Sequence, residues 1–308
     1  MRIELSKINE AVRSDARGFI EECDALYDSR VAAAADAIKE RLKQSRVILL
    51  AGPSSSGKTT TAGRVKRAME KRGIFCHMIS LDDYYRSKNE PGYPLTPEGE
   101  PDLETPLALQ LELLNEHLSM LDKGEEIMVP HFDFRLQRRV EEDAWPLRLK
   151  ENEAVIFEGI HGLNPLLTQH HPEATRLFVS TATSVYDGDI EVFDRVWMRV
   201  LRRMVRDFNF RSADAEETLG LWRNVRLGEK HYISPYKNTA HIAIDTTHGY
   251  EVSAFRKTAE PMLLNLRENA QPRLTKNILE GLESFEPLAL DLLPASCLLK
   301  EEFLPKDN

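Results

Sequence analysis

The pattern of apolar and polar positions predicts strands that alternate with helices. Short apolar runs with the length of buried strands occur at Val47–Ala51, Ile74–Ser80, Ala154–Phe157, Arg176–Ser180 and His241–Ile244. The helical stretches cover residues 57–72, 106–121, 190–208, 214–230 and 251–267. Such alternation is typical of βαβ units around a parallel sheet. We therefore expect an α/β fold with helices on both faces of the sheet.

The same pattern divides the chain into three parts. Residues 1–45 predict a helical arm, because they are rich in alanine and almost free of glycine and proline. Residues 46–270 contain the alternating elements and form the main domain. Within it, residues 127–150 predict a small β excursion. Residues 271–308 predict a helical, leucine-rich tail.

Composition excludes several classes of protein. Of 308 residues, 42% are hydrophobic and 30% are charged, which is typical of a soluble globular chain. The apolar runs are too short to cross a membrane, and the polar first ten residues do not resemble a secretory signal. Three scattered cysteines indicate a reducing compartment, so we expect a cytoplasmic protein. A net charge of -9 disfavours nucleic acid as the main partner.

The most specific signal is a phosphate-binding loop between a strand and a helix. Residues 52–59 read G-P-S-S-S-G-K-T and match G-x-x-x-x-G-K-[ST]. Lys58 is expected to reach the β- and γ-phosphates of ATP, and the Thr59 hydroxyl to bind Mg²⁺. No N-K-x-D string for guanine is present, which favours an ATP-using enzyme. The ATP-binding candidates are Gly52, Pro53, Ser54, Ser55, Ser56, Gly57, Lys58, Thr59 and Thr60.

Acidic residues follow two of the predicted strands. Asp82 comes at the end of the second strand, where open parallel sheets bind their ligands. A kinase needs a group that orients or deprotonates the attacking hydroxyl, and Asp82 is the candidate. Its neighbour Asp83 is expected to point elsewhere. Glu158 ends another buried strand and is the candidate for holding Mg²⁺ together with Thr59.

One predicted helix carries a cluster of arginines on a single face. On a helical wheel, five arginines of the stretch 190–208 fall in a sector about 100° wide. An acidic protein is expected to concentrate such charge only toward a partner. We interpret residues 190–215 as a lid whose guanidinium groups stabilise the transferring phosphoryl group. The five are Arg195, Arg199, Arg202, Arg203 and Arg206, with Arg202 and Arg206 as catalytic candidates and Arg199 and Arg203 as ATP-binding candidates.

Taken together, these motifs resemble those of a known family. The chain is similar to the uridine kinase branch of the phosphoribulokinase/uridine kinase family over roughly residues 46–250, and it most resembles bacterial nucleoside-kinase-like members. That resemblance implies a P-loop fold, ATP and Mg²⁺, and often a homo-oligomer. The segments that carry it are Gly52–Thr59, Ile79–Tyr85, Val129–Phe134, Phe157–Gly162 and Arg202–Asp207.

The resemblance also implies roles on the acceptor side. Asp82 would act as base toward a sugar hydroxyl, and Tyr85 would lie near the nucleoside. Glu104 would hold ribose hydroxyls. Phe132 would line the base pocket, and Arg139 would follow the base-contacting segment.

One position departs from the family pattern. True uridine kinases have a histidine where this chain has Gln137, and that histidine helps to read the pyrimidine. Glutamine can still donate and accept hydrogen bonds, so Gln137 is a candidate for base recognition or a solvated loop residue. The identity of the base is therefore open.

These observations lead to three hypotheses about function. The first is a kinase that transfers the γ-phosphoryl group of ATP to the 5′-hydroxyl of a nucleoside, uridine or cytidine. The second keeps the fold but changes the acceptor to a sugar phosphate, pantothenate or another small alcohol. The third is a nonenzymatic, nucleotide-regulated binding protein, which the intact Lys58, Asp82 and Glu158 disfavour.

Overall fold

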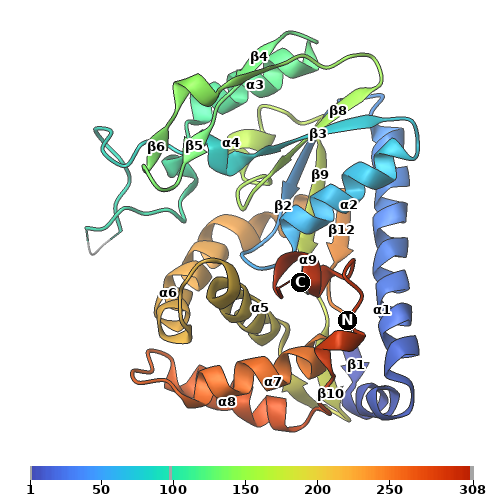
Figure 1. Cartoon of the computed structure of the whole chain (residues 1–308). Coiled ribbons are helices and arrows are strands. Elements are labelled where there is room, and N and C mark those ends of the chain that lie inside the picture. Colours follow the sequence, from blue (N-terminus) through green and yellow to red (C-terminus); the bar gives the residue numbers. More distant parts are fainter. Residues whose placement is uncertain (1, 97–98, 306–308) are drawn as a thin grey trace.

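A five-stranded parallel sheet forms the centre of the protein (Figure 1). The structure is a computed structural model that describes residues 2–96 and 99–305. The strand order is β12-β9-β2-β8-β3. The bounds are β2 Val47–Ala51, β3 Phe75–Ser80, β8 Glu153–Glu158, β9 Thr175–Ser180 and β12 Ile242–Asp245. The expected α/β fold is confirmed, and each predicted strand is present.

The central strand β2 is apolar throughout because both of its faces are covered. Ile48 and Leu50 belong to a hydrophobic cluster built with helices on one side of the sheet. Val47 and Leu49 belong to a second cluster on the other side. Alternate residues of a strand point to opposite faces, so a strand buried on both faces must be a continuous apolar run.

Helices cover both faces of this sheet. On the first side, α1 Leu5–Arg41 and α2 Lys58–Glu70 pack against each other, and α1 also contacts β12. On the second side lie α3 Leu111–Asp122 and the short α4 Pro165–Thr168. The amphipathic stretches thus form helices where the sequence predicted them, although α3 begins later than residue 106 because Pro106–Ala108 forms a separate 3₁₀ turn.

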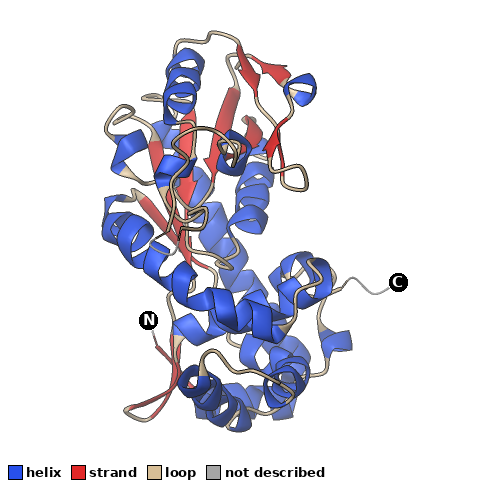
Figure 2. Cartoon of the chain, turned by 90° about the vertical axis from the view of Figure 1, so that its left-hand side faces the viewer, coloured by secondary structure: helices blue, strands red, loops and turns tan. Residues whose placement is uncertain are grey.

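A second body of helices lies below the sheet and packs against the same core. Figure 2 shows the strands of the main sheet at one end of the molecule and these helices at the other. The chain then returns toward α2 in the short α9, Leu298–Glu302. The helices are α5 Arg195–Phe210, α6 Ala215–Gly228, α7 Glu251–Leu264 and α8 Pro272–Glu283.

Several short strands were not predicted. β1 Arg2–Glu4, β10 Ser184–Asp187 and β11 Ile190–Phe193 form a small separate sheet. The helix expected from residue 190 therefore begins at Arg195, after Asp194, whose side chain accepts a hydrogen bond from the Val196 amide. Such strands are too short to show a period-two pattern.

The region of residues 127–150 forms two small hairpin-like pairs, as a β excursion requires. β4 Ile127–Val129 pairs with β7 Trp145–Leu147, and β5 Phe132–Asp133 pairs with β6 Arg138–Arg139. Among the described residues, no helix is both long and apolar enough to cross a membrane.

Candidate active site

The phosphate loop joins β2 to α2 at the carboxyl edge of the sheet, where the sequence placed it. Two of its glycines are required by geometry. Gly57 has φ +83°, a conformation that L side chains rarely adopt. A Cβ on Gly52 would lie 2.1 Å from the carbonyl oxygen of Val179, so no larger residue fits there.

Side chains from outside the loop bind three of its carbonyl groups. Arg199 Nε donates to the Ser54 carbonyl at 2.9 Å, and Arg202 Nη1 lies 3.5 Å from the Ser55 carbonyl. Thr246 Oγ1 donates to the Ser56 carbonyl at 2.7 Å. Because these carbonyl groups are bound by side chains of the protein, the amide groups of the loop are left to bind an anion. The first turn of α2 adds unpaired amides and the positive end of its dipole.

Lys58, Thr59 and Glu158 meet at the mouth of this loop. Lys58 Nζ donates to the Pro53 carbonyl at 3.2 Å, and burial lowers the pKa of its ammonium group. Thr59 Oγ1 donates to Glu158 Oε1 at 3.2 Å. Burial raises the pKa of Glu158, while the nearby Lys58 opposes that shift. The site therefore holds a carboxylate and a hydroxyl side by side next to a cation.

That pair of oxygens has the chemistry of a Mg²⁺ site that a nucleotide completes. Mg²⁺ prefers oxygen ligands and is commonly held by one or two protein groups, substrate phosphates and waters. Among the described residues, no group of three or more His, Cys, Asp or Glu side chains could hold a metal ion. Thr59 and Glu158 fit a phosphate-bridged ion rather than a metal site formed by protein alone.

The adjacent carboxylates Asp82 and Asp83 point to different surroundings. They lie in a 3₁₀ turn, Leu81–Tyr84, that directly follows β3. Asp82 is half-buried near Lys58; this partial burial raises the pKa of Asp82, and the charge of Lys58 opposes the shift. Asp83 instead accepts the Phe132 amide at 3.2 Å and lies 3.2 Å from His131 Nδ1. Only Asp82 faces the phosphate loop.

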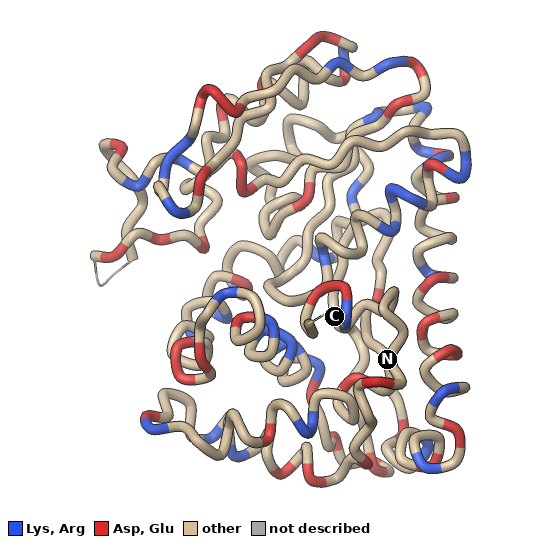
Figure 3. The backbone as a smooth tube through the Cα atoms, in the orientation of Figure 1, with Lys and Arg blue, Asp and Glu red and all other residues tan. Residues whose placement is uncertain are grey.

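Arg195 is exposed, whereas the other four arginines of α5 turn inward; Figure 3 shows the run of basic positions along this helix. Arg202 differs from the expected catalytic position. Its side chain is fully buried, pairs with Glu251 at 2.6 Å and binds the Thr246 carbonyl at 2.7 Å. With its donors engaged behind the loop, Arg202 supports the loop backbone rather than reaching forward to a phosphate. Arg199 is similarly buried and pairs with Glu229 at 2.9 Å.

Three other arginines surround Asp207 on the open side of the site. Arg203 Nη1 donates to Ser54 Oγ at 2.9 Å, and its Nε lies 3.3 Å from Asp207. Arg206 pairs with Asp207 at 2.7 Å, and Arg211 pairs with the same carboxylate at 3.6 Å. The positive charge of Arg206 and Arg211 acts on Lys58 and Asp82, respectively, and that of Arg203 acts on Glu104.

The expected ribose ligand Glu104 lies in a cavity beside these groups. The cavity has a volume of 260 Å³. Burial raises the pKa of Glu104 to about 7, against the opposing effect of Arg203. A Cβ on Gly228 would lie 2.5 Å from the Cβ of Glu104, so this glycine allows α6 to approach. The lining residues are Thr96, Asp102, Glu104, Asn224, Leu227, Gly228, His231 and Tyr232.

Tyr85 and Phe132 form an aromatic group next to Asp82 and Glu104. The ring centroids of Tyr85 and Phe132 are 5.9 Å apart, and Phe134 lies 5.1 Å from Phe132. The Tyr85 hydroxyl donates to the Leu103 carbonyl at 3.0 Å, and both Asp82 and Glu104 act on it electrostatically. The structure thus brings these two aromatic candidates together with both acids.

Gln137 and Arg139 contact protein groups in and beside the excursion. Gln137 is a turn residue with φ +53° whose side chain donates to the Phe134 carbonyl. Arg139 pairs with Glu141 at 2.8 Å and also binds Gln110. Both side chains thus have protein partners, and their contact with a nucleoside stays a prediction.

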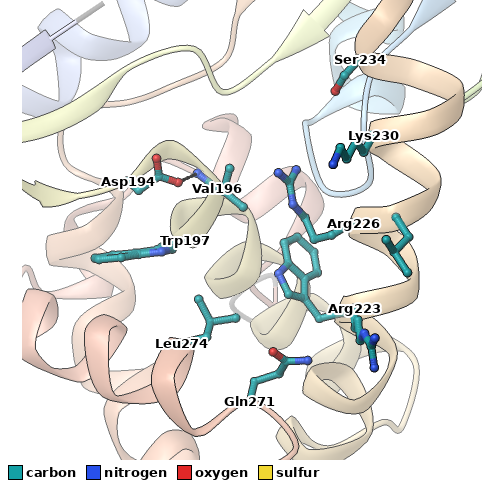
Figure 4. Close-up of a pocket in the computed structure, with 11 residues that line it drawn as sticks. Asp194, Val196, Trp197, Arg223, Arg226, Lys230, Ser234, Gln271 and Leu274 are labelled. Atoms are coloured by element: carbon teal, nitrogen blue, oxygen red, sulfur yellow. Dashed lines mark hydrogen bonds between the residues drawn. The ribbon is translucent and has the colours of Figure 1, made fainter.

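A larger cavity of 610 Å³ lies between α5, α6 and the start of α8 (Figure 4). Trp197, Arg223, Arg226 and Lys230 are among its lining residues. It contains no residue of the phosphate loop and none from the ends of β3 or β8. The reacting groups described above therefore do not lie in this larger cavity.

Four residues that support the site were not selected from the sequence. Glu229 and Glu251 neutralise buried arginines, Thr246 holds the loop, and Asp207 gathers three guanidinium groups. An excess of arginine on one helix face indicates that acidic partners exist, but it does not indicate where in the chain they are.

Comparison with known proteins identifies the family. The model of the phosphoribulokinase/uridine kinase family matches residues 47–253, from β2 to the start of α7. The chain belongs to this family. The matched region contains the phosphate loop, Asp82, Glu104, Glu158 and the arginines of α5. It is accordingly a P-loop kinase of this family, as the motifs indicated.

The individual relatives share at most 30% of their residues with this chain over the matched regions reported below. The uridine kinase of Halalkalibacterium halodurans is 30% identical over 203 residues, which cover 66% of this chain and 86% of that protein. The uridine kinase of Staphylococcus epidermidis is 27% identical over 206 residues, or 66% and 88% of the two chains. A solved D-glycerate 3-kinase from Cryptococcus neoformans is 16% identical with a TM-score of 0.46, covering 67% and 89%.

Proposed function

We propose that this protein transfers the γ-phosphoryl group of ATP to the 5′-hydroxyl of a nucleoside, with uridine and cytidine as the preferred acceptors. The phosphate loop and Lys58 would bind the phosphates, and Thr59 and Glu158 would hold Mg²⁺. The ion would neutralise charge on the β- and γ-phosphates. The similarity to bacterial uridine kinases supports this choice of acceptor.

Asp82 would orient the acceptor and take its proton. The 5′-hydroxyl is a weak nucleophile at neutral pH, and a positioned carboxylate can accept its proton as the new P–O bond forms. Asp82 faces Lys58, which is the group expected at the γ-phosphate. Arg203, Arg206 and Arg211 would stabilise charge on the transferring group.

The observation that carries the choice of acceptor class is the charge of the 260 Å³ cavity that Glu104 lines. Its lining includes the two acids Asp102 and Glu104 and, among the described residues, no lysine or arginine. Above about pH 7, where Glu104 is ionised, a sugar phosphate or pantothenate carries a negative charge that Asp102 and Glu104 would repel. A nucleoside is neutral and offers ribose hydroxyls as hydrogen-bond donors. The aromatic rings of Tyr85, Phe132 and Phe134 lie close by for a base.

The test is ATP consumption with a panel of acceptors. The panel contains uridine, cytidine, adenosine, ribulose 5-phosphate and pantothenate, each with Mg²⁺ and ATP. We expect turnover with the pyrimidine nucleosides and none above background with the two anionic acceptors. A folded Lys58→Ala variant should lose that turnover by orders of magnitude. Preferential turnover of an anionic acceptor would overturn the proposal.

A further inference from the structure

The last described part of the chain returns to the phosphate loop. We call residues Ser296–Leu304 the C-terminal segment; it contains α9, Leu298–Glu302. Figure 1 shows α9 beside the start of α2, and the two helices are in contact. The segment lies outside residues 47–253, which match the family model. Its position is therefore a feature of this chain beyond the shared kinase core.

Specific contacts hold this segment in place. Arg64 of α2 donates to Glu301 Oε2 at 3.2 Å and also binds the Ser296 carbonyl. Asn209 of α5 donates to the Phe303 carbonyl at 2.9 Å, and Leu298 and Phe303 are fully buried. The segment is thus tied to both helices that flank the phosphate loop. These contacts show that the segment is packed against the helices beside the phosphate loop, so that it forms a wall of the site.

One carboxylate in this wall has no hydrogen-bond partner. A Cβ built on Gly57 would lie 3.4 Å from Leu298 Cδ1 and 3.6 Å from Glu302 Oε2. Glu302 therefore lies beside Gly57, the N-cap residue of α2. Glu302 Oε2 is buried, and no described group hydrogen bonds to it. Glu302 also acts electrostatically on Lys58. A buried carboxylate oxygen without a donor among the described groups is free to accept a hydrogen bond from a ligand.

The chemistry of that donor follows from the location. Phosphate oxygens at neutral pH are acceptors and cannot donate to a carboxylate. In a nucleotide whose phosphates lie in the loop, the ribose is attached directly to the α-phosphate. Its 2′- and 3′-hydroxyls are the nearest donors beyond the phosphates. We propose that Glu302 accepts a hydrogen bond from a ribose hydroxyl of the nucleotide, an inference that rests on the proposed use of ATP. The C-terminal segment thereby completes the nucleotide site.

The test compares binding of ATP, 2′-deoxy-ATP and 3′-deoxy-ATP by calorimetry. For the wild-type protein, we expect at least one deoxy analogue to bind about 10-fold more weakly than ATP, the usual effect of a lost hydrogen bond to a charged group. In Glu302→Ala, ATP should weaken to the level of that analogue, and the ratio should fall to about 1. Glu280→Ala, which removes an exposed carboxylate of α8 outside the C-terminal segment, should keep the wild-type ratio.

Other results would contradict the inference in recognisable ways. Equal binding of all three nucleotides by the wild-type protein would exclude a ribose contact. Tighter and equal binding of all three by Glu302→Ala would show that the carboxylate competes with the phosphates instead. Absence of any ATP binding by the wild-type protein would contradict the proposed function itself, and this inference with it.

Discussion

At the scale of single residues, burial beside charge sets the chemistry of this site. Asp82, Glu104 and Glu158 are all carboxyl groups whose pKa is raised by burial, and each lies near Lys58 or an arginine that opposes the shift. Carboxyl groups with a pKa perturbed in this way cluster at functional sites. The same balance distinguishes Asp82 from Asp83, whose partners are a backbone amide and His131.

The two aspartates give the first prediction. Asp82→Asn should lower kcat by about 10²–10⁴-fold, because the amide cannot accept the proton of the acceptor hydroxyl. ATP affinity should change far less, since Lys58 and the loop amides remain. Asp83→Asn should act mainly on KM for the acceptor, through the Phe132 segment that Asp83 holds. Steady-state kinetics and separate ATP binding measure these effects; a mild Asp82→Asn would remove the base assignment.

Glu104 gives a prediction about pH. Its pKa is raised to about 7, so the group gains its negative charge as the pH rises through neutrality. Only the ionised carboxylate offers both oxygens as acceptors to ribose hydroxyls. The value of kcat/KM for uridine should therefore rise with pH, with an apparent pKa of about 7. Glu104→Gln should flatten this rise and leave ATP binding intact.

Deoxynucleosides provide the control for Glu104. Wild-type protein should use 2′- or 3′-deoxyuridine less well than uridine, whereas Glu104→Gln should discriminate less between them. If the pH profile of Glu104→Gln is unchanged, the titrating group is another one, and Glu104 does not bind the ribose.

The residue scale also shows what the sequence could provide. Lys58, Thr59, Asp82 and Glu158 were predictable, because a short motif or a strand end fixes where each side chain lies. The buried role of Arg202 was not, because the helical wheel shows that five arginines share a face but not what that face contacts. Its partner Glu251 lies 49 residues further along the chain, beyond the reach of any local pattern.

At the scale of elements, α5 serves as the support of the phosphate loop. Its arginines bind loop carbonyls on one side and the acids Glu229 and Glu251 on the other. The sequence predicted this helix and its charged face, and it placed the helix start about five residues early because β11 is too short to show a pattern. Because Arg199 and Arg202 are buried in these contacts, this part of the expected lid is packed against the phosphate loop.

Breaking the buried pair tests that role. Arg202→Met leaves Glu251 buried without its partner, and both side chains are fully buried in the structure. Removal of one member of such a pair costs about 3–5 kcal/mol in the free energy of unfolding. Urea denaturation should show this loss. Arg195→Met, on an exposed position of the same helix, should be close to neutral; equal effects of the two changes would contradict the account.

At the scale of the whole molecule, the helical arm is part of one core with the kinase domain. Ile8, Tyr27 and Ile38 of α1 are fully buried in the cluster that also contains Ile48 and Leu50 of β2. The Tyr27 hydroxyl hydrogen bonds to Thr61 Oγ1 of α2 at 2.7 Å. The sequence predicted a helix here, but alanine content and a partial apolar stripe could not reveal which elements it covers.

A shared core predicts cooperative unfolding. Ile38→Ala should lower the free energy of unfolding by about 2–5 kcal/mol, because it opens a cavity in that core. Leu26→Ala, at a position that is 52% exposed on the same helix, should change it by less than about 0.5 kcal/mol. Unfolding followed by far-ultraviolet circular dichroism and by tryptophan fluorescence should coincide. Two separate transitions would show that the arm is an independent unit.

The central claim is that this site phosphorylates the 5′-oxygen of a neutral nucleoside, and the most direct measurement is identification of the product. The purified protein is incubated with Mg²⁺, ATP and uridine, and the products are followed by phosphorus NMR. We predict a new phosphomonoester, coupled to the 5′-protons of uridine, that forms in equal amount with ADP. Release of inorganic phosphate alone, or no consumption of ATP, would contradict the claim.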